Sequence, residues 1–156
     1  MVRAVNEVDT TYVQAERKRA TAWKNNSPTI SSDARHAARY IGNADPAGGP
    51  YPFCIPAEFA SLSLLPEVRG PAIALFHELG IPWHPDGKGP SNHLLSSQVQ
   101  CVNALGQMVA EPQRITRTFC ELLGTAEPLQ IEPGRFLTFE YIGDRDYFNE
   151  GEGMPR

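Results

Sequence analysis

Residues 93–109 carry a regular pattern of apolar and polar positions. Apolar side chains recur at steps of three, four and seven residues, which is the spacing that buries one face of a helix. These apolar residues are Leu95, Val99, Val102 and Val109. A polar but uncharged stripe with the same spacing consists of Ser96, Gln100, Asn103 and Gln107. The pattern predicts a helix whose apolar stripe faces the core. Its polar stripe either packs on a neighbouring helix, meets solvent, or binds a partner through hydroxyl and amide groups.

Two further helices are predicted, one on each side of this stretch. Pro66 suits the first turn of the earlier helix, and Gly80 ends it after an apolar face. The later helix restarts after Pro112 and runs to Gly124. Its predicted apolar face consists of Ile115, Phe119, Leu122 and Leu123.

A β-hairpin is predicted after these helices. Residues 129–131 and 136–142 flank Pro133-Gly134, which favours a type II turn, and the second segment alternates between two faces. Because a lone hairpin is marginal in water, its apolar side must cover the helices or pair with another chain. An unpaired edge would then favour self-association. The predicted fold class is α+β, a helical N-terminal layer packed on a small β-hairpin.

The composition changes near residue 52. The residues before it are polar and end in a Pro- and Gly-rich stretch, which predicts an N-terminal segment followed by a linker. Short helices are predicted there over residues 10–23 and 32–40. A basic cluster around Trp23 is either a solvated helix face or a site for phosphate and a stacked base. The cluster consists of Arg17, Lys18, Arg19 and Lys24. The predicted divisions are 1–52, a helical and hairpin domain at 53–148, and an acidic tail at 149–156.

Composition bounds the class of protein. With 156 residues, of which 41% are hydrophobic, the chain is long enough for one domain with a core. Its net charge of −4 argues against a broadly basic surface for nucleic acid but is compatible with a local basic patch. Without a long apolar run or a secretion leader, we expect a cytoplasmic protein with no membrane contact. Three widely spaced cysteines do not form a secreted disulfide framework. Cys101 and Cys120 are expected to be small buried residues.

The sequence from Pro66 to Gly153 resembles a known family. The resemblance is carried by GIPWH at 80–84, GPSNHLLSSQVQCVNALG at 89–106 and RFLTFEYIG at 135–143. These strings are similar to the N-terminal half of a bacterial restriction-endonuclease family in the PD-(D/E)xK nuclease superfamily. The resemblance implies Mg²⁺-dependent hydrolysis of DNA phosphodiesters by Glu, Asp and Glu-x-Lys residues on an α/β core. It also implies that the chain is an N-terminal portion lacking the Asp and Glu-x-Lys strands. The fold would then be α/β only when those strands complete the sheet.

A metal-dependent nuclease needs clustered carboxylates for the cation and a lysine near the reacting phosphate. Glu140 is the candidate catalytic residue and Mg²⁺ ligand, because it is an acid within an otherwise apolar predicted strand. The alternative is that its side of the strand is exposed to water. The acid-x-Lys strings that end at Lys18 and Lys88 lie in a polar segment and a Gly-rich loop. Neither is predicted to be catalytic, because short strings of this kind are common.

Four residues near the polar stripe are candidates for DNA contact. They are Lys88, for phosphate, and His93, Gln100 and Asn103, for bases or backbone. Two functions are open on this reading. The first is a restriction-endonuclease-like DNA nuclease, and the second is a non-enzymatic helical module that binds DNA or a protein. An inactive remnant of a nuclease is a third alternative.

Overall fold

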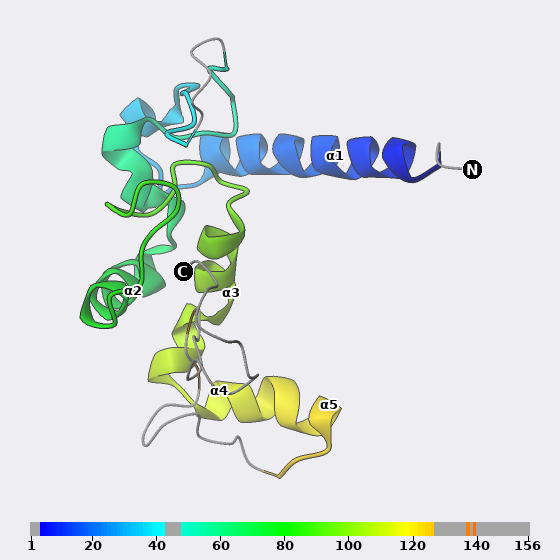
Figure 1. The fold of residues 1–156 in the computed structure, drawn as a ribbon, viewed down its shortest axis with the longest axis vertical. Coiled ribbons are helices and arrows are strands. Elements are labelled where there is room, and N and C mark those ends of the chain that lie inside the picture. The colour runs from blue at the N-terminus through cyan, green and yellow to red at the C-terminus, as the bar shows by residue number, and fades with distance from the viewer. Residues whose placement is uncertain (1–3, 43–47, 127–136, 138, 140–156) are drawn as a thin grey trace, which may run out of the picture. The chain divides into compact units, whose positions relative to one another are not determined.

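The computed structural model describes residues 4–42, 48–126, 137 and 139 (Figure 1). Its helices, in chain order, are α1 Ala4–Asn26, η1 Ser32–Arg35, η2 Ala57–Ser63, α2 Pro66–Glu78, α3 Ser97–Ala110, α4 Gln113–Ile115, η3 Thr116–Cys120 and α5 Glu121–Leu123. The chain forms two compact units, Met1–Gln107 and Met108–Arg156. The divisions predicted after residues 52 and 148 stay predictions.

The α+β prediction is wrong for the described part of the chain. All regular elements in residues 4–42 and 48–126 are helical, and extended segments meet only in two isolated antiparallel bridges. Of the predicted hairpin, Leu137 and Phe139 are described and belong to no strand, and the rest lies outside the described residues. Phe139 is nevertheless buried. Apolar alternation over a short run is satisfied by any backbone that buries every second side chain, so it did not require a strand.

α1 confirms and extends the helix predicted over residues 10–23. It ends at Asn26, where Ser27 precedes Pro28, and a residue before proline is disfavoured in the helical conformation. The amide of Ser27 still donates to the carbonyl of Trp23 at 2.8 Å, which closes the last turn. In Figure 1 the C-terminal part of α1 lies beside the rest of the first unit, and its N-terminal turns extend beyond it.

The helix predicted over residues 32–40 is shorter than expected. Only residues 32–35 form a turn, the 3-10 helix η1, after which His36 has an extended backbone. The amide of Ala38 donates to the carbonyl of Tyr51 at 3.3 Å, and the amide of Tyr51 donates to that of Ala38 at 2.8 Å. Backbone groups that a longer helix would have used are thus bonded to a segment distant in sequence.

The core of the first unit combines residues from before and after the predicted linker. Its buried centre and the partly buried residues packed against it are Ile30, Ala34, Ile55 and Leu94, with Ala20, Trp23, Phe59 and Leu62. α1 and η1 therefore contribute side chains to the same core as η2 and the segment before α3. This shared core holds α1 against the remainder of the unit.

Asn92 ties three backbone segments of the first unit together. Its side chain is fully buried, and its Nδ2 donates to the carbonyls of Arg39 and Ile55, both at 2.7 Å. Its Oδ1 accepts a hydrogen bond from the amide of Ile41 at 3.1 Å. One carboxamide thus satisfies three backbone groups, of which the carbonyl of Ile55 lies in a buried hydrogen bond.

Lys24 holds two further segments from the last turn of α1. Its side chain is only 1% exposed, and its Nζ donates to the carbonyls of His36 at 2.9 Å and Cys54 at 2.8 Å. Burial lowers the pKa of the Lys24 ammonium, an effect partly opposed by the nearby Cys54 thiol. This lysine is therefore a structural group inside the unit rather than part of a basic surface.

α2 confirms the helix predicted from Pro66. Proline occupies its first turn, and the helix ends before Gly80, whose φ of 65° favours glycine. The buried side of α2 includes Val68 and Phe76, and the Phe76 ring stacks on Trp83 with ring centres 3.9 Å apart. This stack holds the segment that follows α2 against α2 itself.

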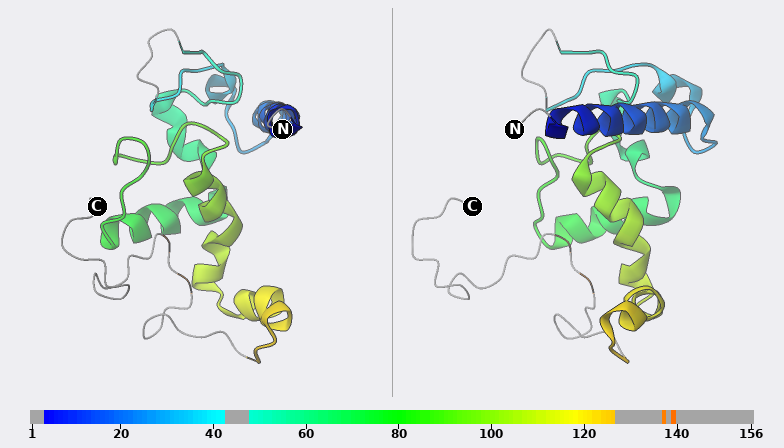
Figure 2. Two further views of the ribbon diagram at one scale, coloured as in Figure 1. Left: turned by 45° about the vertical axis from the view of Figure 1, so that its right-hand side comes forward. Right: turned by 90° about the vertical axis from the view of Figure 1, so that its right-hand side faces the viewer.

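α3 confirms the helix predicted from the two stripes, although it begins at Ser97 rather than at residue 93. Val99 and Val102 are fully buried, as predicted, but Val109 is 37% exposed, so its predicted burial is wrong. α3 crosses α2 where Gly106 meets Val68 (Figures 1 and 2). A Cβ atom at position 106 would lie 3.0 Å from Cγ1 of Val68, so glycine permits the close approach of these helices.

The second unit contains the helix predicted to end at Gly124. Residues 113–123 are continuously helical through α4, the π-helical turn η3 and α5, and Gly124 follows with a φ of 68°. Ile115 is buried, but Leu122 and Leu123 are 80% and 70% exposed, so their predicted burial is wrong. A π-helical turn contains more residues than an α-helical turn, which shifts the residues after it around the helix axis relative to Ile115.

A helix that spans a bilayer needs about 20 mainly apolar residues. No single helix in the described part of the chain is long and apolar enough to cross a membrane. η2 and α2 reach that length and composition only when taken together, and they are bent by 107° relative to one another.

Candidate functional site

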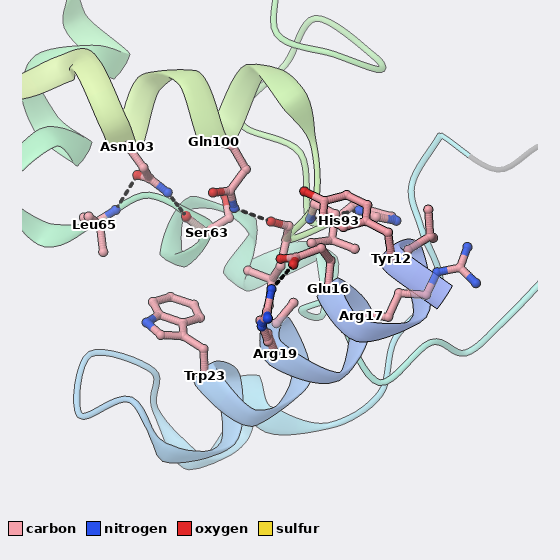
Figure 3. A pocket seen from close by; sticks show the side chains of 14 residues that line it. Tyr12, Glu16, Arg17, Arg19, Trp23, Ser63, Leu65, His93, Gln100 and Asn103 are labelled. Carbon is pink, nitrogen blue, oxygen red and sulfur yellow. Dashed lines mark hydrogen bonds and ion pairs between the residues drawn. The ribbon is translucent and has the colours of Figure 1, made fainter. Parts of the chain in front are cut away.

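A cavity of about 700 Å³ lies in the first unit between α1 and the beginning of α3, and we name it the α1–α3 groove. Its lining comes from α1, the link between η2 and α2, residues 93–95 and the first turns of α3. Its charged, aromatic and hydrogen-bonding side chains include Arg17, Arg19, Trp23, Ser63, His93, Gln100 and Asn103. In Figure 3 Trp23 projects from α1 on one side, and Ser63, Gln100 and Asn103 lie across from it. A volume of this size is typical of small-molecule sites.

Asn103 uses its carboxamide to fix the wall of the groove. Its Oδ1 accepts from the amide of Leu65 and its Nδ2 donates to the carbonyl of Ser63, both at 2.9 Å. Leu65 occupies the N-cap position of α2, so α3 holds the junction between η2 and α2 (Figure 3). For this member of the polar stripe, packing on neighbouring elements accounts for the amide.

Gln100 and Gln98 show that amides on one helix have different roles. Gln98 is buried and acts like Asn103, because its Oε1 accepts from the amide of His84 at 2.9 Å and its Nε2 donates to the carbonyl of Pro82 at 3.1 Å. Gln100 is exposed and lines the groove, and its Nε2 donates to the carbonyl of Leu94. Sequence reasoning missed Gln98, since its partners are backbone atoms that leave no signal in the sequence.

His93 is held as a neutral side chain at one end of the groove. Its ring meets Tyr40 edge-on, with centres 5.2 Å apart, and Phe53 at 5.0 Å. Burial, and then the positive charge of Arg17, lower the pKa of the imidazole. Its Nδ1 accepts from the amide of Leu95 at 3.1 Å, so the proton of the neutral ring resides on Nε2.

The basic residues of α1 occupy three different environments. The Arg17 guanidinium lies 5.1 Å from the centre of the Phe53 ring, and Arg17 lines the groove. Arg19 also lines the groove, and its side chain is 73% exposed while it pairs with Glu16. Lys18 is exposed outside the groove, and Lys24 is buried. Two of the four residues in the predicted cluster thus contribute positive charge to the groove.

The structure brings together three of the four residues predicted to contact DNA. His93, Gln100 and Asn103 line the groove, whereas Lys88 does not. Lys88 is exposed in the loop after Trp83, where its amide donates to Oδ1 of Asp86 at 3.1 Å. Glu140, the predicted catalytic residue and metal ligand, lies outside the described residues.

The three cysteines are free thiols in unlike environments. Cys54 and Cys120 are buried, as expected of the latter, but Cys101 is exposed, so its predicted burial is wrong. Position 101 falls between the buried Val99 and Val102 in sequence and therefore points away from their face. Burial raises the pKa of the Cys54 thiol to about 11, although nearby Lys24 opposes the shift.

We expect Cys101 to react with an aromatic disulfide reagent much faster than the buried thiols in the native protein. Near pH 8 the raised pKa leaves only about one part in a thousand of Cys54 as thiolate, and burial restricts access to it. Absorbance after mixing should show one fast thiol, and the Cys101→Ser variant should lose that phase. A fast phase that survives this substitution would contradict the assignment.

Comparison with known proteins gives a match to a described family. The sequence pattern of the family "Restriction Endonuclease associating with ARP" matches residues 17–154. The match begins at Arg17 and therefore includes the part of α1 that carries both groove arginines and Trp23. No curated protein and no solved structure matches the chain.

Proposed function

Because the chain belongs to the family of restriction endonucleases associating with ARP, we propose that it acts on DNA. In the finer form of the proposal, it is the N-terminal portion of a PD-(D/E)xK enzyme that hydrolyses DNA phosphodiesters. The observation that carries the proposal is the match over residues 17–154, which spans the groove arginines on α1 and the amides on α3.

The chemistry of the α1–α3 groove supports contact with nucleic acid. Guanidinium groups bind phosphate through a rigid fork of donors, and aromatic rings stack on bases. A carboxamide can donate and accept hydrogen bonds at a base edge. Arg17, Trp23 and Gln100 supply these three kinds of group in one cavity. Because the net charge is −4, affinity for DNA has to come from such a local site rather than from the whole surface.

The described residues do not fit a Mg²⁺ site of the kind that the nuclease resemblance implies. They contain no group of three or more His, Cys, Asp or Glu side chains that could hold a metal ion. The proposed metal ligand and catalytic carboxylate is Glu140, outside the described part of the chain. No step of hydrolysis is assigned to the residues of the groove.

The second candidate is a helical binding module without enzymatic activity. It is compatible with the described fold, in which all regular elements of residues 4–42 and 48–126 are helical. The family description names an association with ARP, and the exposed Leu122 and Leu123 offer an apolar surface to a protein partner. Self-association stays a prediction.

We expect the chain to bind duplex DNA with a strong dependence on salt, and Lys88→Ala to reduce that dependence. Each phosphate contact contributes roughly 0.9 to the slope of log affinity against log salt, so losing one lowers the slope by about one. Fluorescence anisotropy over a salt series measures both quantities. Arg117→Ala removes the same charge from an exposed site in the second unit and is the matched control. Absence of DNA binding would contradict the proposal, and an unchanged slope would remove Lys88 from the interface.

Cleavage of supercoiled plasmid DNA, with and without Mg²⁺, separates the two candidate functions. Metal-dependent nicking that Glu140→Gln abolishes would support hydrolysis, since glutamine keeps the size of the side chain and removes its charge. Binding that is never followed by nicking would support the module. The anisotropy of Glu140→Gln with DNA, measured in parallel, shows whether binding survives the substitution.

A further inference from the structure

We propose that the α1–α3 groove binds a single nucleobase together with its phosphate. The base stacks on Trp23, and Arg19 holds the phosphate. The nucleotide can come from a free mononucleotide or from DNA in which one nucleotide has left the duplex. The DNA source rests on the proposed function above, whereas the free mononucleotide does not.

Ser63 is the first observation that points to a ligand. Its side chain is 1% exposed and lines the groove, and its Oγ has no hydrogen-bond partner among the described residues. A buried hydroxyl without a partner costs free energy, and such groups are rare in native proteins. A base edge or ribose oxygen in the groove would supply the missing hydrogen bond.

Trp23 provides a fixed aromatic surface. It packs against the buried core cluster of the first unit and also lines the groove, so its indole is held by the core rather than moving freely. Figure 3 shows the indole across the groove from Ser63 and Gln100. A base stacked on the indole would therefore direct its edge toward these two polar side chains.

The remaining polar groups match a base in both donor and acceptor character. Nε2 of Gln100 is bonded to the carbonyl of Leu94, which leaves its Oε1 to accept a hydrogen bond. His93 offers an Nε2–H donor, because its Nδ1 is occupied by the amide of Leu95. Heterocyclic bases present donors and acceptors together, unlike a purely anionic ligand.

The charges of the groove suit a phosphate at the side of α1. Arg17 and Arg19 line the groove with one acidic residue, Glu16, which pairs with Arg19. The groove thus has an excess of positive charge in a chain whose net charge is negative. Because the Arg19 side chain is 73% exposed, it can turn from Glu16 to an incoming phosphate without unfolding α1.

Ser63→Ala gives the sharpest test, because the proposal predicts opposite effects on stability and binding. Removing an unpaired buried hydroxyl should leave the denaturation midpoint unchanged or raise it. Loss of the hydrogen bond to the nucleotide should weaken binding about three- to tenfold. A purely structural role for Ser63 would instead lower the midpoint and leave affinity unchanged, which would overturn its part in the site.

Arg19→Ala and Lys18→Ala form a matched pair on neighbouring positions of α1. Each removes one positive charge from an exposed side chain, but only Arg19 lines the groove. We expect Arg19→Ala to weaken binding of deoxyadenosine 5′-monophosphate about tenfold and Lys18→Ala less than about twofold. Equal losses would show a general charge effect and overturn the assignment of the phosphate site.

Two probes distinguish the sources of the nucleotide. Deoxyadenosine 5′-monophosphate is titrated into the Trp83→Phe chain, where Trp23 is the remaining tryptophan, and quenching reports stacking. Calorimetry on the unsubstituted chain confirms the affinity without relying on Trp83→Phe. The second probe is a duplex that carries 2-aminopurine opposite an abasic site, compared with the same base opposite thymine.

Quenching of Trp23 fluorescence by the mononucleotide, if both Ser63→Ala and Arg19→Ala weaken it, supports a free mononucleotide as the ligand. A change in 2-aminopurine fluorescence on protein binding, weakened by the same variants and without mononucleotide binding at millimolar concentration, supports the DNA source. If both signals are absent, the inference is overturned. If the labelled duplex still binds in the anisotropy assay with equal affinity for both variants, the proposed function stands without this site. If no duplex binds, the proposed function fails, and the mononucleotide titration alone decides the inference.

Discussion

Replacement of Asn92 by alanine is expected to lower the free energy of unfolding by about 2 to 4 kcal/mol, because one buried and two partly buried hydrogen bonds are lost together. The carbonyls of Arg39 and Ile55 and the amide of Ile41 would be left without the partner they have in the native protein. Asn92 is 0% exposed, so water does not replace its carboxamide without opening the fold. A loss of this size is a large fraction of the whole stability of a small domain.

Urea denaturation followed by circular dichroism and tryptophan fluorescence measures the effect. Asn25→Ala is the matched control, because Asn25 is exposed on α1 and alanine is the better helix former. We expect the control to be unchanged or slightly more stable. A loss below about 1 kcal/mol for Asn92→Ala would contradict the structural role assigned to this side chain.

Replacement of Lys24 by methionine is expected to lower the free energy of unfolding by about 2 to 3 kcal/mol. Methionine has a similar length and fills the same space, but it donates no hydrogen bond. The carbonyls of His36 and Cys54 would lose the Nζ donor that lies 2.9 and 2.8 Å from them. Removing a buried charge offsets part of this loss, so the net effect is smaller than for Asn92.

The pH dependence of stability gives Lys24 a signature of its own. Burial lowers the pKa of its ammonium below the usual value of 10.5, so the unfolded chain binds more protons between the two pKa values. The contribution of Lys24 is therefore fully present above 10.5 and is lost as the pH falls through the lowered pKa. The difference in stability between the native chain and Lys24→Met should grow with pH across that window.

Lys18→Met is the control for both Lys24 experiments, since Lys18 is an exposed lysine on the same helix. It makes the same chemical change without removing a buried hydrogen bond. We expect its stability and pH profile to follow those of the native chain. A Lys24→Met variant that behaved like this control would show that the buried lysine is dispensable for the fold.

The helices could be predicted from the sequence because their signals are local. Pro66 and Gly80 mark the ends of α2, and the apolar stripe through Val99 and Val102 faces the core in α3. Leu137 and Phe139 were wrongly predicted to lie in a strand, for a related reason. Alternation shows that side chains face two environments, but strand formation also needs a partner backbone that a single segment does not reveal.

The candidate site could be predicted in part. The polar stripe identified Gln100 and Asn103, and both line the groove together with His93. The stripe did not show that the Asn103 carboxamide is hydrogen-bonded to the backbone of Ser63 and Leu65. Every residue offers such backbone groups, so these partners leave no signal in the sequence. The basic cluster on α1 did not reveal that Lys24 points inward while Arg19 borders the groove.

What the sequence by itself determined is the presence of α1, α2 and α3 and the buried sides of α2 and α3, because helical periodicity and the residues that end helices act within a few turns. Only the tertiary structure decided that α1 lies beside α3 and that Trp23 and Ser63 line one cavity. It also decided which amide and cationic side chains are buried and hydrogen-bonded to the backbone, as Asn92 and Lys24 are. These outcomes depend on contacts between residues 30 or more positions apart, whose formation is governed by the packing of the whole unit rather than by any local pattern.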